Sequence, residues 1–320
     1  MVQHLGEIMD ETLAAAETLA ARRAAYPEIA RIEVSELIAA GRRGAVFRGV
    51  RDGAEVALRL MHVPDPATAI ARMAEALEEL AGHMTDGPFR VPRLVAALPE
   101  AGAIVTQFIP GETLRDRLAT APEGERDAQL RAAGQWFAQL VAPPARHRVG
   151  AFQPQFWTER RAAALDRAAA EDRPGGDPRM ARALARRLEE MTPSLRGARV
   201  TQGRGHGDFH AGKLIRAPEA LYGVDIEGAH FLPMVKELAR FLVHLELQVP
   251  RDGPGWHGVS ASDCGALLAE VPLAPHDEEA ILPFMIGVEL GDACAGPPRE
   301  GADDARLMRA IGAYLAATAP

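Results

Sequence analysis

The 320-residue sequence lacks several features that would place it in a specialised class of protein. Its only two cysteines, Cys264 and Cys294, do not have metal-ligand spacing, and we interpret them as reduced thiols in a helical core. No window of eighteen apolar residues occurs, so no membrane-spanning helix is expected. The N-terminal segment lacks the basic and apolar parts of a secretory signal. We therefore expect a cytoplasmic location and no membrane partner.

An excess of positive charge is also absent. The chain has 36 basic and 44 acidic residues, for a net charge of -8, whereas nucleic-acid-binding domains usually present a basic face. We therefore expect no nucleic-acid partner, although a local basic pocket for an anionic ligand is still compatible with this charge. Residues 251–320 carry eleven acidic and four basic side chains. Such a region is most often a soluble surface, and it would also permit a cationic ligand.

What the chain does contain is an α+β order of elements. A helix is expected over residues 5–25, and helical patterns dominate from residue 112 onward, including two solvated helices within 158–192. Between these regions the sequence predicts a helix at 67–83 and five strands, at 32–40, 44–50, 55–61, 92–98 and 102–108. This order predicts a small five-stranded antiparallel N-lobe and a large, mostly helical C-lobe, with any cleft at the connector between them.

A glycine-containing turn joins the first two predicted strands. Gly41 and Gly44 are three positions apart, and glycines in such a turn allow backbone amides to approach a phosphate without obstruction by a Cβ atom. An ordinary hairpin turn is the commoner explanation of this pattern. The next strand, VALRL at 56–60, contains one cation, Arg59. It is either an exposed strand arginine or a cation directed at phosphates under the turn.

The strongest signal is HGDFHAGKLIRAPEALYGVDIEGA, residues 206–229. It contains Asp208 and Asp225, with a predicted hairpin between them, so that the two carboxylates could face one cleft. Phosphoryl transfer needs a base and a magnesium ligand, because its catalysis consists mainly of positioning and charge neutralisation. A capped turn would explain an isolated His-Gly-Asp, but it would not explain the ordered set.

These motifs resemble those of the aminoglycoside phosphotransferase and choline kinase branch of the protein-kinase-like fold. HGDFHAGKL resembles the catalytic loop HGDxHxGNxL, GVDIEGA resembles the metal-binding segment that often reads IDWE, and PMVKELA resembles the helix start PxxxDLA. The resemblance implies an α+β, two-lobed, protein-kinase-like fold. Its parts would be an N-terminal helical extension (1–30), an N-lobe (31–108) and a helical C-lobe (109–320), which holds a catalytic loop at 206–213 and a metal segment at 224–228.

The same resemblance implies roles for individual residues. Asp208 would be the base that orients an acceptor hydroxyl, and Asp225 would hold Mg²⁺ at the phosphates. His206 and His210 would support the loop, and Glu227 would assist a second ion or be solvated. ATP is the implied cofactor, and the residues expected to contact it are Gly41, Gly44, Val46, Ala57, Arg59, Gln107, Phe108 and Ile109.

The chain departs from the family pattern at three charged positions. Arg59 replaces a lysine, which is not a neutral exchange at a tight phosphate site. Met73 stands where the lysine's glutamate partner is expected, unless a shifted register brings in Glu75, Glu78 or Glu79. Lys213 replaces a metal-binding asparagine, and an ammonium group cannot coordinate a metal. Lys213 would then substitute for the missing ion, pair with Asp208 or Asp225, or point into solvent.

Two functions remain open from the sequence. The first is an ATP-dependent phosphotransferase that modifies a hydroxyl of a small molecule, because both aspartates are present in the expected order. The alternative is a pseudokinase, a nucleotide- or partner-binding module with weak or no catalysis, because three charged positions depart together. The acceptor is not specified, and Trp157 and Trp256 would serve either as a wall for a cationic acceptor or in core packing.

Overall fold

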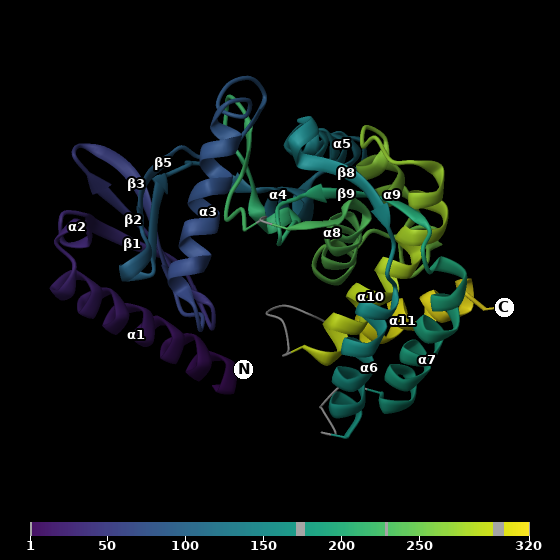
Figure 1. The fold of residues 1–320 in the computed structure, drawn as a ribbon. Helices are drawn as coiled ribbons and strands as arrows, with labels where there is room; N and C mark the ends of the chain where they lie inside the picture. Colours follow the sequence, from purple (N-terminus) through teal and green to yellow (C-terminus); the bar gives the residue numbers. More distant parts are fainter. Residues whose placement is uncertain (1, 171–176, 228–229, 297–303, 320) are drawn as a thin grey trace. The chain divides into compact units, whose positions relative to one another are not determined.

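The structure is a computed structural model that describes residues 2–170, 177–227, 230–296 and 304–319 (Figure 1). The chain forms two compact units. Unit 1 comprises Met1–Gly111 together with Ala217–Ala229, and unit 2 comprises Glu112–Arg216 together with His230–Pro320. The segment with Asp225 is grouped with the N-terminal residues in unit 1, whereas the family resemblance places it with the C-lobe. No helix among the described residues is long and apolar enough to cross a membrane.

Unit 1 is built on a five-stranded antiparallel sheet, as the sequence predicted. The strands, in spatial order, are β1 (Glu33–Gly41), β2 (Gly44–Arg51), β3 (Ala54–Met61), β6 (Ala103–Gln107) and β5 (Leu94–Leu98). The helices of this unit are α1 (Val2–Ala25), the single turn α2 (Pro27–Ala30) and α3 (Pro66–Ala81), and a 3₁₀ turn, η1, covers Pro99–Ala101. Helix α3 begins at Pro66 because the side chain of Asp65 caps it by accepting from the Thr68 N–H at 3.0 Å.

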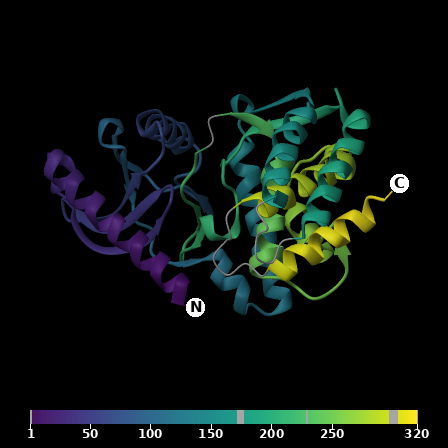
Figure 2. The same cartoon turned by 90° about the horizontal axis from the view of Figure 1, so that it is seen from below.

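The two faces of this sheet have different surroundings. Residues that alternate along β2 and β3, such as Phe47 and Leu58, are buried in a core that also includes Ala15 of α1. Helix α1 lies along the sheet, as Figures 1 and 2 show. The intervening residues, among them Ala57 and Arg59, are only half-buried and lie on the other face. Side chains on that face keep part of their surface exposed.

A short parallel pairing attaches the segment with Asp225 to unit 1. Strand β11 (Leu221–Gly223) pairs with β4 (Phe89–Arg90), and the Arg90 guanidinium donates to the Tyr222 hydroxyl at 3.1 Å. With only two paired positions, this contact is too short to produce a periodic signal in the sequence.

Unit 2 is mostly helical. Its helices are α4 (Leu114–Thr120), α5 (Glu123–Val141), α6 (Gln155–Ala170), α7 (Pro178–Leu195), α8 (Met234–Gln248), α9 (Ala261–Leu268), α10 (Leu282–Ala295) and α11 (Asp304–Ala317), with short turns η2 (Pro144–Arg146), η3 (Ala211–Lys213) and the π-helical η4 (Asp277–Ile281). A three-stranded sheet, which the sequence analysis did not predict, has the order β12 (Phe231–Pro233), β9 (Arg199–Arg204), β8 (His147–Ala151). Two short pairs complete the unit: β7 (Glu112–Thr113) with β10 (Leu214–Arg216), and β13 (Gly255–Trp256) with β14 (Val259–Ser260).

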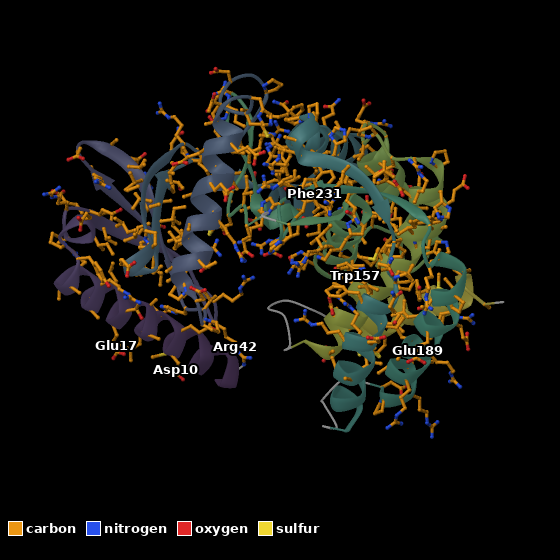
Figure 3. The ribbon with its side chains drawn as sticks, viewed as in Figure 1. Asp10, Glu17, Arg42, Trp157, Glu189 and Phe231 are labelled. Atoms are coloured by element: carbon orange, nitrogen blue, oxygen red, sulfur yellow. The ribbon has the colours of Figure 1, made fainter. Side chains whose placement is uncertain are left out.

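The Arg-rich helices α6 and α7 are less solvated than the sequence suggested. Leu165, Leu184 and Leu188 are fully or almost fully buried, and Arg161, only 8% exposed, forms an ion pair with Asp292 of α10. Trp157 is buried within unit 2, whereas Glu189 lies on the surface of α7 (Figure 3). Trp157 therefore takes the core-packing role. The expectation of two solvated helices was wrong for the face that packs against α10. The number of charged residues in a segment does not show whether its leucines fall on one face of a helix.

Candidate active site

The loop with Asp208 is anchored in unit 2 by an aromatic cluster. Phe209 is fully buried, and its ring centroid lies 5.8 Å from that of Trp136, 5.0 Å from Phe137 and 4.9 Å from Phe241. The neighbouring Asp208 side chain, in contrast, keeps 24% of its surface exposed. The hydrophobic position between His-Gly-Asp and His210 thus fixes the loop.

Buried polar groups hold the backbone on either side of Phe209. The Gly207 N–H donates to both carboxylate oxygens of Glu237, at 3.2 and 3.1 Å, and Glu237 is 3% exposed. Gly207 has φ 92°, a conformation that strongly favours glycine. His206 is fully buried, and its Nδ1 accepts from the Asp208 N–H at 3.4 Å. Glu237 and His206 therefore restrict the backbone just before the carboxylate.

Asp208 is surrounded by cationic and imidazole groups. Its Oδ1 lies 3.3 Å from Nη1 of Arg240, and its Oδ2 lies 3.7 Å from Nε2 of His210. Burial acts to raise the pKa of Asp208, but the interaction with His210 and the charges of Arg240 and Lys213 outweigh it and hold the pKa well below its usual range. The side chain keeps 24% of its surface exposed, so an ionised carboxylate is available to a ligand.

His210 is held in one orientation. Its Nδ1 accepts from the Gly212 N–H at 3.2 Å, which assigns the proton of the neutral ring to Nε2, the atom that faces Asp208. The ring stacks on His244 of α8 with centroids 4.0 Å apart. Burial lowers the pKa of His210 despite the attraction of Asp208, so the ring is neutral near pH 7. Its Nε2–H group therefore faces the Asp208 carboxylate, 3.7 Å from Oδ2.

Lys213 ends the turn η3 and is half-buried. Its charge lowers the pKa of both Asp208 and His210, so it acts on this loop. Arginine and lysine together number 36, and Lys213 and Lys236 are the only two lysines of the chain. In such an arginine-rich protein, Arg59 follows the general composition, whereas a lysine at position 213 is the exception.

In unit 1, two carboxylates and two guanidinium groups form a second cluster. Arg59 forms an ion pair with Asp225, and its Nη2 lies 3.6 Å from Oε1 of Glu227. Arg43, from the glycine-containing turn, lies 3.1 Å from Oε2 of Glu227. Asp225 has φ 62°, the left-handed conformation that aspartate tolerates better than most residues. Arg59 is thus directed at the acidic segment in this structure, and not at an exposed surface.

The predicted nucleotide-contacting residues of the sheet share its half-buried face. Val46 lies opposite Arg59 in the register of β2 and β3, and Ala57 is two positions from Arg59 along β3. Gly44 has φ 142°, and a Cβ atom there would lie 2.0 Å from the carbonyl oxygen of Leu60, so the sheet itself requires this glycine. Gly41 has open space around it.

The connector residues are partly engaged by the sheet. Gln107 donates its N–H to the carbonyl of Arg93 at 2.9 Å, and Phe108 donates to that of Glu55 at 3.3 Å. The Phe108 ring lies 4.5 Å from the Arg48 guanidinium, and Ile109 is 5% exposed. These contacts fix the backbone of the segment expected to meet an adenine.

The position of Met73 agrees with the departure noted in the sequence. Met73 is 4% exposed and packs in the apolar face of α3, where Glu75 and Glu78 are exposed and Glu79 is half-buried. The carboxylates that contact Arg59 in the structure come instead from the 225–227 segment. Sequence reasoning missed the contributions of Arg43 and Arg240, since nothing in their local pattern marks them, although Arg240 directly follows the PMVKELA motif.

Asp225 and Glu227 have the oxygen ligands that Mg²⁺ prefers. Across the described ranges, no three His, Cys, Asp or Glu side chains gather closely enough to hold a metal by themselves. Magnesium in nucleotide sites is commonly bound by one or two protein carboxylates plus phosphate oxygens, so this pair fits an ion that arrives with a nucleotide. Both carboxylates have guanidinium partners here, and those ion pairs would have to rearrange around it.

Comparison with solved structures defines the class of fold. A choline/ethanolamine kinase family protein from Mesorhizobium loti matches with a TM-score of 0.60 at 16% identity, covering 95% of this chain and 99% of that chain. A choline kinase from Cryptosporidium parvum Iowa II matches with a TM-score of 0.57 at 11% identity, covering 93% and 94%. A thermostable mutant of aminoglycoside phosphotransferase APH(4)-Ia, in a ternary complex with ADP and hygromycin B, matches with a TM-score of 0.55 at 16% identity, covering 90% and 95%. The fold is protein-kinase-like, as predicted.

Comparison with family models is more specific than comparison of folds. A model of the phosphotransferase enzyme family matches residues 35–253, and this chain belongs to that family. Comparison with curated protein sequences gives no match. The matched span includes the glycine-containing turn, the loop with Asp208 and the segment with Asp225. Family membership confirms the resemblance that these motifs indicated and supports a small-molecule phosphotransferase.

Proposed function

We propose that this protein transfers the γ-phosphoryl group of ATP to a hydroxyl group of a small molecule. The observation that carries the proposal is the state of Asp208, an ionised and partly exposed carboxylate on a loop held by buried groups. A general base in phosphoryl transfer needs such a fixed carboxylate within reach of the acceptor. The nucleotide complexes of the structural relatives name ADP, AMP-PNP and GDP, and the first two support ATP as the donor.

In this reaction the acceptor oxygen forms a bond to the γ-phosphorus, while the bond from that phosphorus to the β,γ-bridging oxygen breaks. The electron pair of the broken bond leaves with ADP, and the acceptor's proton passes to Asp208 and then to solvent. His206, Glu237 and His210 hold Asp208 in place. Lys213, whose charge acts on Asp208, would neutralise charge on the phosphoryl group.

We assign nucleotide binding to the half-buried face of the unit 1 sheet. Val46 and Ala57 would contact the base, the 107–109 backbone would pair with its edge, and the 41–44 turn would cover the phosphates. Asp225 would hold Mg²⁺, with Glu227 beside it. When bound, the ion neutralises phosphate charge, and Arg59 would then exchange part of its contact with Asp225 for a phosphate oxygen.

The test is a phosphate-transfer assay with γ-labelled ATP and Mg²⁺. Hygromycin B, kanamycin, choline and ethanolamine are the first acceptors, because they occur in the names of the structural relatives. We expect transfer to at least one hydroxyl compound and a loss of about 10²–10⁴-fold in Asp208→Asn. Background transfer and ATP hydrolysis across a broad hydroxyl panel, equal in wild type and Asp208→Asn, would contradict the proposal. Nucleotide binding without transfer would instead indicate a pseudokinase.

The scarcity of lysine allows a second, independent test of the donor site. An acyl-phosphate derivative of ATP acylates amines close to the nucleotide phosphates. Because the chain has only Lys213, Lys236 and its N-terminal amine to react, mass spectrometry can assign the product directly. We expect acylation of Lys213, suppressed by excess ATP, and little at Lys236. Equal labelling of both lysines, unaffected by ATP, would contradict a phosphate-proximal Lys213.

A further inference from the structure

Helix α8 presents a second cation to the loop with Asp208. Nη1 of Arg240 lies 3.3 Å from Oδ1 of Asp208 and also donates to the carbonyl of Gly207 at 3.4 Å. One guanidinium therefore contacts both the carboxylate and the backbone next to it. A flexible surface arginine would gain little from one such contact, but two contacts to adjacent residues define an orientation.

The Arg240 guanidinium also has an acidic partner on a second helix, α10. Its Nε lies 3.8 Å from Oε2 of Glu289 on α10, and Glu289 is only 2% exposed. Glu289, Asp208, Glu237 and Asp292 all favour the charged form of Arg240, and together they outweigh its burial and raise its pKa. A buried carboxylate on a second helix thus fixes where the arginine can reach, and the arginine in turn fixes Asp208.

The arrangement distinguishes the two oxygens of Asp208. Oδ1 faces Arg240, whereas Oδ2 faces the longer, 3.7 Å contact with His210. We propose that Arg240 is a positioning residue that occupies Oδ1 and thereby directs Oδ2 to the acceptor hydroxyl. This inference rests on the proposed phosphotransferase function, and it adds a residue outside the loop motif to the machinery of that reaction.

A consequence for pH follows from the charges around Asp208. The groups that face it are His210 and Lys213 from its own loop and Arg240 from α8, and the charges of Arg240 and Lys213 lower its pKa. Removing Arg240 removes one of them, so Asp208 would bind its proton more tightly and its pKa would move toward the ordinary value. The acidic limb of the pH–rate profile would therefore move to higher pH.

The experiment compares Arg240→Met with Arg240→Lys and with Arg161→Met. Arg161 is the control for the loss of an arginine that pairs with helix α10: it pairs with Asp292, and its side chain is 9% exposed against 28% for Arg240. In Arg240→Met we expect a kcat reduced about tenfold or more, within the range for losing the alignment of a general base, and a shifted acidic limb. Arg240→Lys should recover part of both effects, and Arg161→Met should leave the limb in place.

A readout that needs no turnover separates this inference from the proposed function. Carbodiimides react with protonated carboxyl groups, so labelling of Asp208 at about pH 5 reports its protonation. We expect several-fold more labelling of Asp208 in Arg240→Met than in wild type or Arg161→Met. Equal labelling and an unshifted acidic limb would overturn the role of Arg240, even in an active enzyme. Increased labelling in a protein without transfer activity would support Arg240 and count against the proposed function.

Discussion

Asp208 and Asp225 each have an arginine beside them, but the groups that support the two arginine–aspartate pairs differ. Arg240, next to Asp208, is backed by Glu289, which is 2% exposed, and the loop itself is anchored by the fully buried Phe209. Arg59, next to Asp225, shares its second acidic partner, Glu227, with Arg43, whose side chain is 61% exposed. The loop in unit 2 is fixed by an aromatic core, whereas the segment in unit 1 combines a buried side chain, Ile226, with ion pairs on both sides of it.

This difference matches what the two carboxylates have to do. A base must keep its geometry throughout the reaction, since small misplacement reduces the rate strongly. A carboxylate that takes part in binding a metal and a nucleotide has to exchange partners, and partly exposed ion pairs can open at low cost. The aromatic core and the ion pairs are therefore expected to respond differently to substitution and to salt.

The largest expected effect concerns the core under Asp208. Phe209→Ala should destabilise unit 2 by about 3–5 kcal/mol, because it removes a fully buried ring from an aromatic cluster. The three tryptophans, Trp136, Trp157 and Trp256, all lie in unit 2, so urea unfolding followed by tryptophan fluorescence reports on that unit. Phe108→Ala, in unit 1, should leave this transition nearly unchanged. Equal shifts in both variants would remove the distinction between the units.

A smaller effect is expected when the ion pairs of unit 1 are broken. Arg59→Met leaves Asp225 and Glu227 without their shared guanidinium and should cost about 1–2 kcal/mol, because the pair is only partly buried. Arg43→Met removes a mostly exposed partner and should cost less than about 0.5 kcal/mol. Hydrogen exchange of peptides covering 217–227 measures both. Protection that falls as far in Arg43→Met as in Arg59→Met would contradict this order.

The sequence was informative where a pattern has a local cause. The five strands of unit 1 were predicted because turns and alternation mark them, and the loop with Asp208 was recognisable because its residues are adjacent. Strands β8 and β9 were missed, since His147–Ala151 and Arg199–Arg204 are short, polar and separated by two helices. Their pairing is a long-range contact that no single window contains.

The site was predictable only in part, for the same reason. The sequence identified Asp208, His210, Lys213 and Asp225 as chemically important, and the structure gives each a defined environment. It could not show that Arg59 contacts Asp225, because these residues are 166 positions apart in the chain. The contact of Arg240 with Asp208 was also invisible, since a helix position facing a loop has no sequence signature.

High salt should affect hydrogen exchange differently in the segment with Asp225 and in the loop with Asp208. Ion pairs near the surface are screened at high ionic strength, whereas burial of Phe209 is not weakened by it. Hydrogen exchange at about 1 M sodium chloride should therefore lower protection within residues 221–227 by a few-fold and leave residues 206–210 unchanged. Increased exchange at 206–210 alone would reverse the assignment of core and ion-pair anchoring.

The smallest effect concerns Glu237, whose burial raises its pKa despite the nearby cations Lys236 and Arg240. A raised pKa means that the folded protein binds this proton more tightly, so the contribution to stability is full below the unfolded value and is lost as pH rises through the folded value. Wild type should therefore gain stability relative to Glu237→Gln as the pH falls from neutrality toward about 4.3. Tryptophan-monitored unfolding at several pH values measures it, and a pH-independent difference would contradict it.

The helix α1 has a practical consequence for how this protein can be divided. The family match begins at residue 35, yet the buried cluster of unit 1 includes Ala15, Ile29 and Ile32. A fragment cut at the family boundary would keep every residue proposed for chemistry and expose the apolar side of its sheet, including Phe47, to water. Such a fragment would self-associate, because a large exposed apolar face promotes aggregation. The evolutionary unit and the folding unit of this protein are therefore different lengths of chain.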